Sequence, residues 1–244
     1  EPTPYHVWLS EIMLQQTRVE AVKPYYDRFL QALPDVRRLA EAEEEKLLKL
    51  WEGLGYYNRA RNLKKAAGKV VTEYGGDIPG RYEELLKLPG IGSYTAGAIA
   101  SIAFDQVQPA VDGNVLRILA RLRADDRDIL DAKVKKSVEE DLRGIMPIDR
   151  PGDFNQALME LGAMVCIPNG AAKCEVCPWE EFCLAKEQQR VEEFPRKAPK
   201  KPRSIEEKTI LVIQDANLVA LRKRPDKGLL AGMYEFPSME GSKD

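Results

Sequence analysis

The amino-acid sequence predicts an all-α protein that is followed by a linker and a short β-containing segment. Apolar residues recur at helical spacing from Tyr5 to about Cys166, with turn residues between the runs. Residues 187–205 are polar and rich in Lys, Arg and Pro, which is typical of linkers. From Lys208 onward the apolar runs are short and rich in β-branched residues, which indicates strands.

Length and composition are those of a globular protein with a sizeable core. The chain has 244 residues, of which 44% are hydrophobic, and its formal net charge is −2. This charge does not by itself indicate a nucleic-acid partner, so such binding would depend on local basic patches. We find no secretory signal and no apolar run near the roughly 18 residues of a membrane helix. We therefore expect a soluble, cytoplasmic protein with no membrane partner.

The boundaries of the expected elements follow from periodicity and turn residues. Helices are expected over residues 5–17, 19–32, 35–40, 43–51, 82–88, 93–103, 133–143 and 153–166, with others from the glycine turn at 53–55 to Tyr74 and from Asp112 onward. Two strands, 209–213 and 218–221, flank a turn at 215–217. We interpret these strands as the start of a second domain that is incomplete at Asp244.

The helical part is organised around the segment Leu88–Leu122. It opens with Pro89-Gly90-Ile91-Gly92, whose glycines leave bare backbone amides just ahead of an apolar helix. Amides at a helix start, together with the helix dipole, form a seat for an anion. Most glycine turns only reverse the chain, but this turn lies between two helical patterns. That order of helix, hairpin and helix suits a nucleic-acid phosphate.

Asp112 follows in the same segment, at the start of the next predicted helix. Helix 93–103 carries the chain roughly 16 Å from the hairpin, and residues 104–111 span at most about 26 Å. The chain can therefore return and place Asp112 near the anion seat. The alternative is that Asp112 only caps its helix and stabilises it by about 1 kcal/mol, and spacing alone favours the cap.

Glu11 lies in the first predicted helix, on the face that also carries Val7 and Leu14. Its carboxyl group is either at the solvent edge of this apolar face or buried for a chemical purpose, and both interpretations stay open here. Partial burial would raise its pKa above the usual value of about 4.3, so that it would hold a proton for donation.

The glycine turn Gly53-Leu54-Gly55 leads into a helix that begins with Tyr56 and Tyr57. One interpretation is a helix start whose tyrosines pack in the core. The other is a loop that presents an aromatic wedge to a base step while basic residues meet phosphates. The mixture of aromatic and basic types favours the second interpretation, and the basic residues concerned are Arg59, Arg61, Lys64 and Lys65.

The cysteines of the chain lie within eighteen residues of one another, at Cys166, Cys174, Cys177 and Cys183. Clustered cysteines in an unsecreted chain indicate a metal or an iron–sulfur cluster rather than disulfides. The spacing C-x7-C-x2-C-x5-C contains one C-x2-C pair, whereas zinc sites commonly use two such pairs or histidines. It therefore favours a cubane iron–sulfur cluster, with zinc as the alternative.

Taken together, these motifs resemble the helix–hairpin–helix superfamily of DNA glycosylases, which includes the endonuclease III family. Within the superfamily they are most similar to the adenine-DNA glycosylase (MutY) family. The resemblance covers Pro4 to about Phe194, with a shorter extension through Arg222–Pro237. The motifs that carry it are YHVWLSE at Tyr5–Glu11, MLQQT at Met13–Thr17, GLGYY at Gly53–Tyr57, LPGIGSYTAG at Leu88–Gly97, VDGNV at Val111–Val115 and FNQALMELGA at Phe154–Ala163.

The resemblance implies a two-lobed, all-α glycosylase domain over residues 1–186. A six-helix barrel lobe would occupy about 17–122, and an iron–sulfur lobe would combine 1–16 with 123–186. The linker 187–205 would lead to the start of a MutT-like domain at 206–244. A 4Fe–4S cluster would be held by Cys166, Cys174, Cys177 and Cys183.

The resemblance also implies roles for individual residues. Glu11 would protonate the adenine ring and then handle water, and Asp112 would stabilise the sugar cation or its adduct. Tyr94, Asn114 and Gln156 would line the base pocket, the first two of them at the catalytic centre. The residues expected to enter the base stack are Gln16 and Tyr56, and the other residues expected at the base or the DNA are Gln15, Thr17, Leu54, Gly90 and Gly92.

The expected activity is hydrolysis of the N-glycosidic bond of adenine mispaired with 8-oxoguanine or guanine in duplex DNA. We expect a monomer, located at the nucleoid in a bacterial cell, that flips the base out of the stack. A glycosidic bond breaks through an oxocarbenium-like state, which requires an acid for the leaving group and a carboxylate for the developing cation. Glu11 and Asp112 would supply that pair.

Two alternatives remain open. One is an endonuclease III-like glycosylase and lyase for oxidised pyrimidines, but Tyr94 stands where that family carries a lysine, so a Schiff-base lyase would lack its nucleophile. The other is a non-enzymatic DNA-binding module with an iron–sulfur cluster or zinc, in which Glu11 and Asp112 would be dispensable. One departure from the family concerns loop geometry: seven residues, Ile167–Lys173, separate the first two cysteines where relatives commonly have six.

Overall fold

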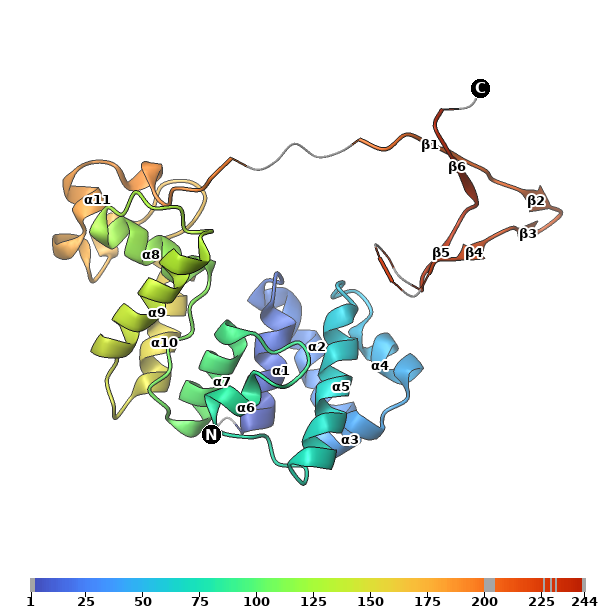
Figure 1. Cartoon of the computed structure of the whole chain (residues 1–244), viewed down its shortest axis with the longest axis horizontal. Coiled ribbons are helices and arrows are strands. Elements are labelled where there is room, and N and C mark those ends of the chain that lie inside the picture. Colours follow the sequence, from blue (N-terminus) through green and yellow to red (C-terminus); the bar gives the residue numbers. More distant parts are fainter. Residues whose placement is uncertain (1–2, 200–204, 226, 229, 231, 243–244) are drawn as a thin grey trace. The chain divides into compact units, whose positions relative to one another are not determined.

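The computed structural model describes residues 3–199, 205–225, 227–228, 230 and 232–242. The chain forms two compact units, Glu1–Ala198 and Pro199–Asp244 (Figure 1), and each is described by itself. The first unit is built of helices and the second contains short strands. Within the described residues, no helix is both long enough and apolar enough to cross a membrane.

The helices of the first unit agree with the predicted all-α fold. They are α1 (Pro4–Leu14), α2 (Val19–Ala32), α3 (Val36–Glu41), α4 (Glu44–Trp51), α5 (Asn58–Glu73), α6 (Tyr82–Leu85), α7 (Ser93–Phe104), α8 (Gly113–Arg123), α9 (Ala132–Ile145), α10 (Pro151–Glu160) and α11 (Leu184–Glu187). A π-helical turn, η1 (Leu161–Val165), follows α10, and 3-10 turns lie at η2 (Cys174–Val176), η3 (Glu180–Phe182) and η4 (Val191–Glu193).

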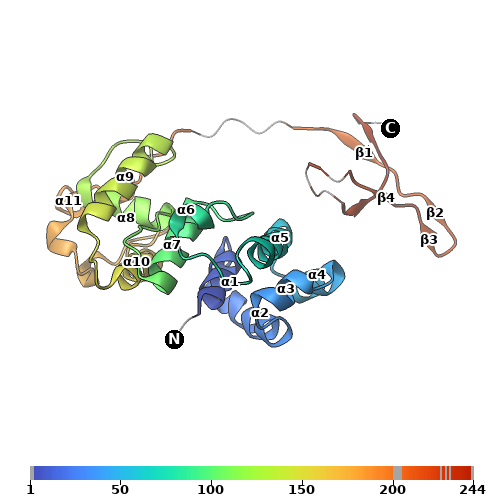
Figure 2. The ribbon, with the colours of Figure 1, turned by 60° about the horizontal axis from the view of Figure 1, so that its bottom comes forward.

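Helix α1 lies at the centre of the first of two apolar cores. Its buried residues, among them Trp8 and Met13, pack with side chains from α2 to α7. Figures 1 and 2 show α1 between α7 on one side and α2 and α5 on the other, and α1 contacts all three helices. Thr3 caps this helix through a hydrogen bond from the His6 amide at 3.3 Å, and Pro4 occupies its first turn, where a missing N–H costs little.

The second core is built by α8, α9 and α10, with Val115, Leu142 and Leu158 among its members. This division differs from the predicted lobes, which placed residues 1–16 with the cysteines and 17–122 in the other lobe. Helix α1 is apolar around most of its circumference and therefore packs inside the first core. Helix α8 buries its apolar face against α9 and α10, so it belongs to the second core.

Residues 105–112 return from the end of α7 to the start of α8 along α7 itself. At Gly97 a Cβ atom would lie 2.4 Å from the carbonyl oxygen of Pro109, so only glycine permits this close approach. Asn155 of α10 is 1% exposed and holds the segment from the other side, because its Oδ1 accepts a hydrogen bond from the Ala110 amide at 3.0 Å. The chain thus returns, as its segment lengths allow, and α8 starts beside α7.

The predicted linker at 187–205 was wrong in its first part, which packs on α8. Arg121 donates from Nε to the carbonyl oxygens of Val191 and Phe194, both at 3.1 Å, and the Phe194 ring is buried. The polar composition of this segment suggested a linker, but composition does not show that its backbone carbonyl oxygens accept hydrogen bonds from a buried arginine. Residues 200–204, also part of the predicted linker, lie outside the described residues.

The second unit contains three antiparallel pairs of short strands, β1 with β6, β2 with β3, and β4 with β5. The strands are β1 (Lys208–Ile210), β2 (Gln214–Asp215), β3 (Leu218–Val219), β4 (Arg222–Lys223), β5 (Tyr234–Glu235) and β6 (Ser238–Glu240). The predicted turn at 215–217 joins β2 to β3. The predicted strands 209–213 and 218–221 are shorter in the structure, where β1 ends at Ile210 and β3 at Val219. Ile210 pairs with the distant Ser238. A pairing between segments so far apart leaves no local signal in the sequence.

Candidate active site

Glu11 is the one acidic residue buried on α1, where it is 8% exposed among residues of the first core. Burial raises the pKa of its carboxyl group to about 7; a hydrogen bond with Tyr94 lowers it in part, and the charge of Asp112 raises it further. The interpretation of Glu11 as a residue at the solvent edge is therefore wrong. This carboxyl group can hold a proton near neutral pH.

Tyr94 lies in the first turn of α7 and contacts Glu11. Its hydroxyl group also lies 3.5 Å from Sδ of Met159 on α10. Burial, followed by the charge and hydrogen bond of Glu11, raises the pKa of Tyr94 well above its usual range. The phenol therefore stays neutral and can donate a hydrogen bond to a partner in the site.

Asp112 is the N-cap of α8, as one of its two interpretations predicted. Its Oδ1 accepts hydrogen bonds from the amides of Asn114 at 2.8 Å and Val115 at 2.9 Å. Its Oδ2 accepts one from Nδ2 of Asn114 at 2.7 Å. The second interpretation does not conflict with the cap, because the charge of Asp112 acts on both Glu11 and Tyr94. The carboxylate that caps α8 therefore also lies near enough to Glu11 and Tyr94 for its charge to raise the pKa of both.

Arg117 connects Asn114 to the cysteine-containing segment. Its Nη2 donates to Oδ1 of Asn114 at 3.0 Å and to the carbonyl oxygen of Gly162 at 2.8 Å, and its Nε donates to that of Cys166 at 2.9 Å. The helix predicted over 153–166 is helical almost to its end, because α10 continues directly into the π-helical turn η1. The carbonyl oxygen of Gly162, which accepts the hydrogen bond from Arg117, belongs to η1. This last turn before Cys166 is π-helical and therefore wider than an α-helical turn.

A cleft of about 370 Å³ opens beside Glu11, a volume within the range of ligand-binding pockets. Its walls come from α1, α2, α7, α10 and η1 and include Leu14, Gln156 and Met159. Gln156 is exposed to the cleft and donates from Nε2 to the carbonyl oxygen of Gly152 at 3.3 Å. The predicted pocket residue Gln156 therefore shares a cavity with Glu11.

The predicted hairpin, residues 89–92, lies between α6 and α7. Gly90 has a positive φ of 79°, and a Cβ atom there would lie 2.8 Å from Cβ of Asn62, so glycine is required. Gly92 is the N-cap of α7, and neither its φ nor the surrounding space demands glycine. The first amides of α7 have no partner within the helix, and Nζ of Lys135 donates to Oγ of Ser93 at 2.9 Å. A cation therefore stands next to these amides.

Gln16 and Tyr56 lie on two neighbouring loops and project outward. Both are non-glycine residues with positive φ, 58° and 47°, and Tyr56 is 64% exposed. On the same loops, Gln15 donates from Nε2 to Oγ1 of Thr95 at 3.3 Å, and Thr17 is half-buried. Leu54 is buried in the first core, which makes it a packing residue rather than a surface contact.

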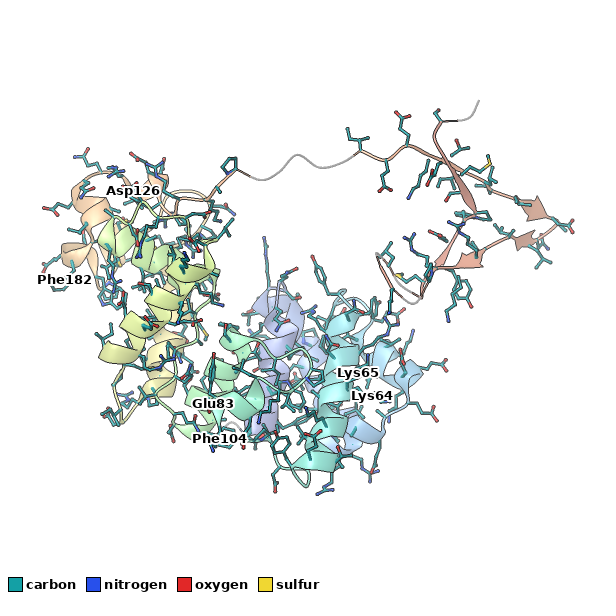
Figure 3. All side chains as sticks on the ribbon, in the orientation of Figure 1. Lys64, Lys65, Glu83, Phe104, Asp126 and Phe182 are labelled. Carbon is teal, nitrogen blue, oxygen red and sulfur yellow. The ribbon has the colours of Figure 1, made fainter. Side chains whose placement is uncertain are left out.

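The expectation that Arg59 meets phosphates is wrong. Its guanidinium group is turned inward and donates to backbone carbonyl oxygens of both loops. Arg61 on the same helix pairs through Nε with Glu44 at 2.8 Å. Lys64 and Lys65 lie on the middle of α5 (Figure 3) and remain the basic residues available there.

The cysteines line a single cavity beside α8. Arg121 donates from Nη1 to Sγ of Cys166 at 3.3 Å, and burial, followed by the charges of the other cysteines, raises the pKa of Cys174. Across the described ranges, no three His, Cys, Asp or Glu side chains converge closely enough to hold a metal ion. A zinc ion needs sulfur atoms about 3.8 Å apart, since Zn–S bonds are about 2.3 Å long. The thiols thus surround a common space without converging on one ion.

Sequence reasoning missed three buried polar residues that position the site, namely Arg117, Arg121 and Asn155, and it assigned the half-buried Arg59 to phosphates. Arg117 and Arg121 stand four residues apart, which places them on one face of α8. Long charged side chains are rarely buried without partners, and the sequence does not reveal which face of a helix is covered. Asn155 precedes the predicted Gln156, and only its helical phase with Gly152 and Leu158 distinguishes the buried amide from the exposed one.

Comparison with known proteins gives three findings. Residues 9–145 match the family described as HhH-GPD superfamily base excision DNA repair protein. The chain is 43% identical over 279 residues to an adenine DNA glycosylase of Mus musculus, covering 96% of this chain and 54% of that protein. It is 36% identical over 242 residues to an adenine DNA glycosylase of Buchnera aphidicola, covering 99% of this chain and 69% of that protein.

The fold is similar to that of a solved non-covalent endonuclease III–DNA complex. The TM-score is 0.66 at 25% sequence identity, and the match covers 78% of this chain and 86% of that chain. The chain spans about half the length of the mouse protein, at 54%, and a larger part of the Buchnera protein, at 69%.

Proposed function

Because the chain belongs to the helix–hairpin–helix superfamily of base-excision DNA repair proteins, and within it to the adenine DNA glycosylases, we propose that it hydrolyses the N-glycosidic bond of adenine in duplex DNA. We further propose that the adenine it removes is mispaired with 8-oxoguanine or guanine. The observation that carries the proposal is the buried carboxyl group of Glu11, which lines the cleft, has a pKa of about 7 and lies within electrostatic reach of Asp112.

Glu11 is the proton donor in this proposal. Adenine is a poor leaving group as an anion, so its ring must receive a proton as the glycosidic bond breaks. A carboxyl group whose pKa lies near 7 is a good general acid at neutral pH. Once it has given up its proton, the same group can take one from the attacking water. Asp112 supplies the negative charge that faces the cationic sugar.

The site lacks an amine at the position of Tyr94, which supports base removal without strand cleavage. A lyase that works through a Schiff base needs a nucleophilic nitrogen at the sugar. The Tyr94 phenol is neutral because its pKa is raised, so it donates a hydrogen bond to Glu11 or to the substrate instead. Trapping with borohydride tests this point, since a strong covalent DNA complex would contradict it.

The DNA is proposed to lie across the hairpin and the two loops. The amides at the start of α7, with Lys135 beside them, suit a phosphate. The exposed Gln16 and Tyr56 suit insertion into the base stack, and the cleft at Glu11 suits the flipped base.

The cysteine cavity is proposed to hold a 4Fe–4S cluster. Four thiols around one space, in a spacing with a single C-x2-C pair and no histidine, fit a polynuclear group better than zinc. Arg121 fits this assignment, because hydrogen bonds to cluster sulfurs tune such centres. When bound, the cluster would fix the segment from Cys166 to Cys183 against α8. Protein purified without oxygen should be brown and contain iron and sulfide, and a colourless, active, zinc-loaded protein would overturn the assignment.

A duplex assay tests the proposed function against its alternatives. The protein is incubated with duplexes that contain 8-oxoguanine:adenine, guanine:adenine or thymine glycol. Release of adenine from the first two supports the proposal, whereas release of thymine glycol with strand cleavage indicates the endonuclease III-like alternative. Binding without any base release indicates a DNA-binding module.

A further inference from the structure

We propose that Arg59 is a positioning residue that locks the two exposed loops, residues 15–18 and 52–57, into one rigid unit. This inference rests on the proposed function, in which Gln16 and Tyr56 on these loops enter the base stack. The loops join α1 to α2 and α4 to α5, so they are far apart in the sequence. Arg59, in the first turn of α5, lies between them.

One side of the guanidinium group holds the end of α1 and the first loop. Its Nη1 donates to the carbonyl oxygens of Ile12 at 3.0 Å, Met13 at 3.0 Å and Gln15 at 2.6 Å. The first two belong to the last turn of α1, whose carbonyls have no partner within the helix. A cation is favourable at this end of a helix dipole.

The other side of the same group holds the second loop. Its Nη2 donates to the carbonyl oxygens of Leu54 at 3.0 Å and Gly55 at 3.3 Å, and also to Oγ1 of Thr17 at 3.3 Å. The guanidinium carbon lies 5.5 Å from the centroid of the Tyr56 ring. One side chain therefore joins both loops and contacts the exposed ring of Tyr56.

The backbone of both loops requires such a clamp. Gln16 and Tyr56 are in the left-handed region, at φ values of 58° and 47°, which non-glycine residues adopt rarely. Such conformations persist only where the surrounding structure fixes them, and they gather at functional sites. A planar fork of five N–H groups can bond two loops at once, whereas a lysine ammonium group concentrates its donors at one point.

The substitution Arg59→Lys tests the proposal because it keeps the charge and removes the fork. Arg37→Lys is the control: Arg37 lies on α3, donates to the carbonyl oxygen of Gly75 at the surface of the same helical unit, and does not line the cleft. Hydrogen exchange of the protein alone is measured first. We expect faster exchange in residues 12–18 and 52–57 of the Arg59→Lys variant and parental exchange in the control.

Single-turnover excision is then measured on two duplexes, one with adenine opposite guanine and one with adenine opposite an abasic site. The second duplex needs less work to flip the base. We expect Arg59→Lys to excise adenine from the first duplex about tenfold or more slowly than the parental protein, since small misplacements of site residues reduce rates by such factors. On the second duplex its excision rate should be close to the parental rate. DNA affinity and the pH profile set by Glu11 should stay parental.

Equal losses on the two duplexes, no loss at all, or parental exchange in both loops would overturn the proposal. Should Arg59→Lys fail to fold, Thr17→Val removes one acceptor of Nη2, and a smaller change in the same direction is expected. Absence of adenine excision by the parental protein would defeat the proposed function alone, because hydrogen exchange still decides whether Arg59 locks the loops.

Discussion

At the scale of single residues, the environment of Glu11 determines what its carboxyl group can do. The substitution Glu11→Gln preserves the size of the side chain and most of its hydrogen bonding but removes the transferable proton. We predict near-parental DNA affinity and adenine excision slowed by about 10²-fold or more, the usual share of general acid–base catalysis. Single-turnover excision measured beside DNA affinity checks this. Excision at the parental rate would show that Glu11 is not the acid.

The same burial makes folding stability depend on pH. The pKa of Glu11 is about 7 in the folded protein against an ordinary value of 4.5, so the folded state binds its proton more tightly. The stabilising contribution is therefore complete below pH 4.5 and is lost as the pH rises to about 7, a loss of roughly 3 kcal/mol.

Urea unfolding of the parental protein and of Glu11→Gln between pH 4.5 and pH 8 measures this contribution. The contributions of the other titrating groups to the pH dependence cancel when the unfolding free energies of the two proteins are subtracted. The parental protein should lose stability relative to the variant as the pH rises. A difference that does not change with pH would mean that Glu11 is not buried as described.

At the scale of elements, the close approach of the 105–112 segment to α7 decides where Asp112 lies. Gly97→Ala would place a Cβ atom 2.4 Å from the Pro109 carbonyl oxygen, so the backbone must move. Gly68→Ala on α5 is the matched change, because a Cβ atom there meets nothing within 4 Å.

We predict opposite signs for these two glycine substitutions. Gly97→Ala should destabilise the protein by about 1–3 kcal/mol through overpacking. Gly68→Ala should stabilise it by about 1 kcal/mol through helix propensity. Chemical denaturation checks both values, and excision should fall only in the first variant because Asp112 is displaced. Stabilisation by both substitutions would contradict the described packing.

At the scale of the whole molecule, the proposed chemistry uses only the helical unit Glu1–Ala198. Among the described residues, both clusters of buried apolar side chains draw on this unit alone. Many apolar side chains of the second unit are exposed, including Leu218 and Leu221. The helical unit therefore has its own apolar core.

We predict that a protein ending at Ala198 retains the thermal transition of the helical unit and excises adenine from guanine:adenine duplexes as the longer chain does. The cut falls after the packed Phe194 and therefore leaves the contacts of Arg121 intact. Calorimetry and single-turnover assays of the two proteins side by side check this. A lower transition temperature for the shorter protein would show that the second unit supports the helical core.

Local signals in the sequence predicted much of the fold and of the site. Helical periodicity located the helices to within a few residues, and the motifs identified the family that the comparisons establish. Glu11 and Asp112 could be named from the chemistry and position of their carboxyl groups in the sequence, whereas Tyr94 and Gln156 were named through the family resemblance. The roles proposed for them remain predictions.

The sequence by itself determined which chemical groups are present and which helices carry them. Only the tertiary structure decided which of these groups are buried and which backbone groups they serve. The sequence left open whether Glu11 lies at the surface or in the interior, and the packing of α7 on α1 decided for the interior. The sequence suggested that Arg59 meets phosphates, whereas in the structure it donates hydrogen bonds to the backbone of two loops. The physical reason is that periodicity is a local property of the chain, whereas burial and hydrogen-bond partners depend on residues that are distant in sequence and adjacent in space.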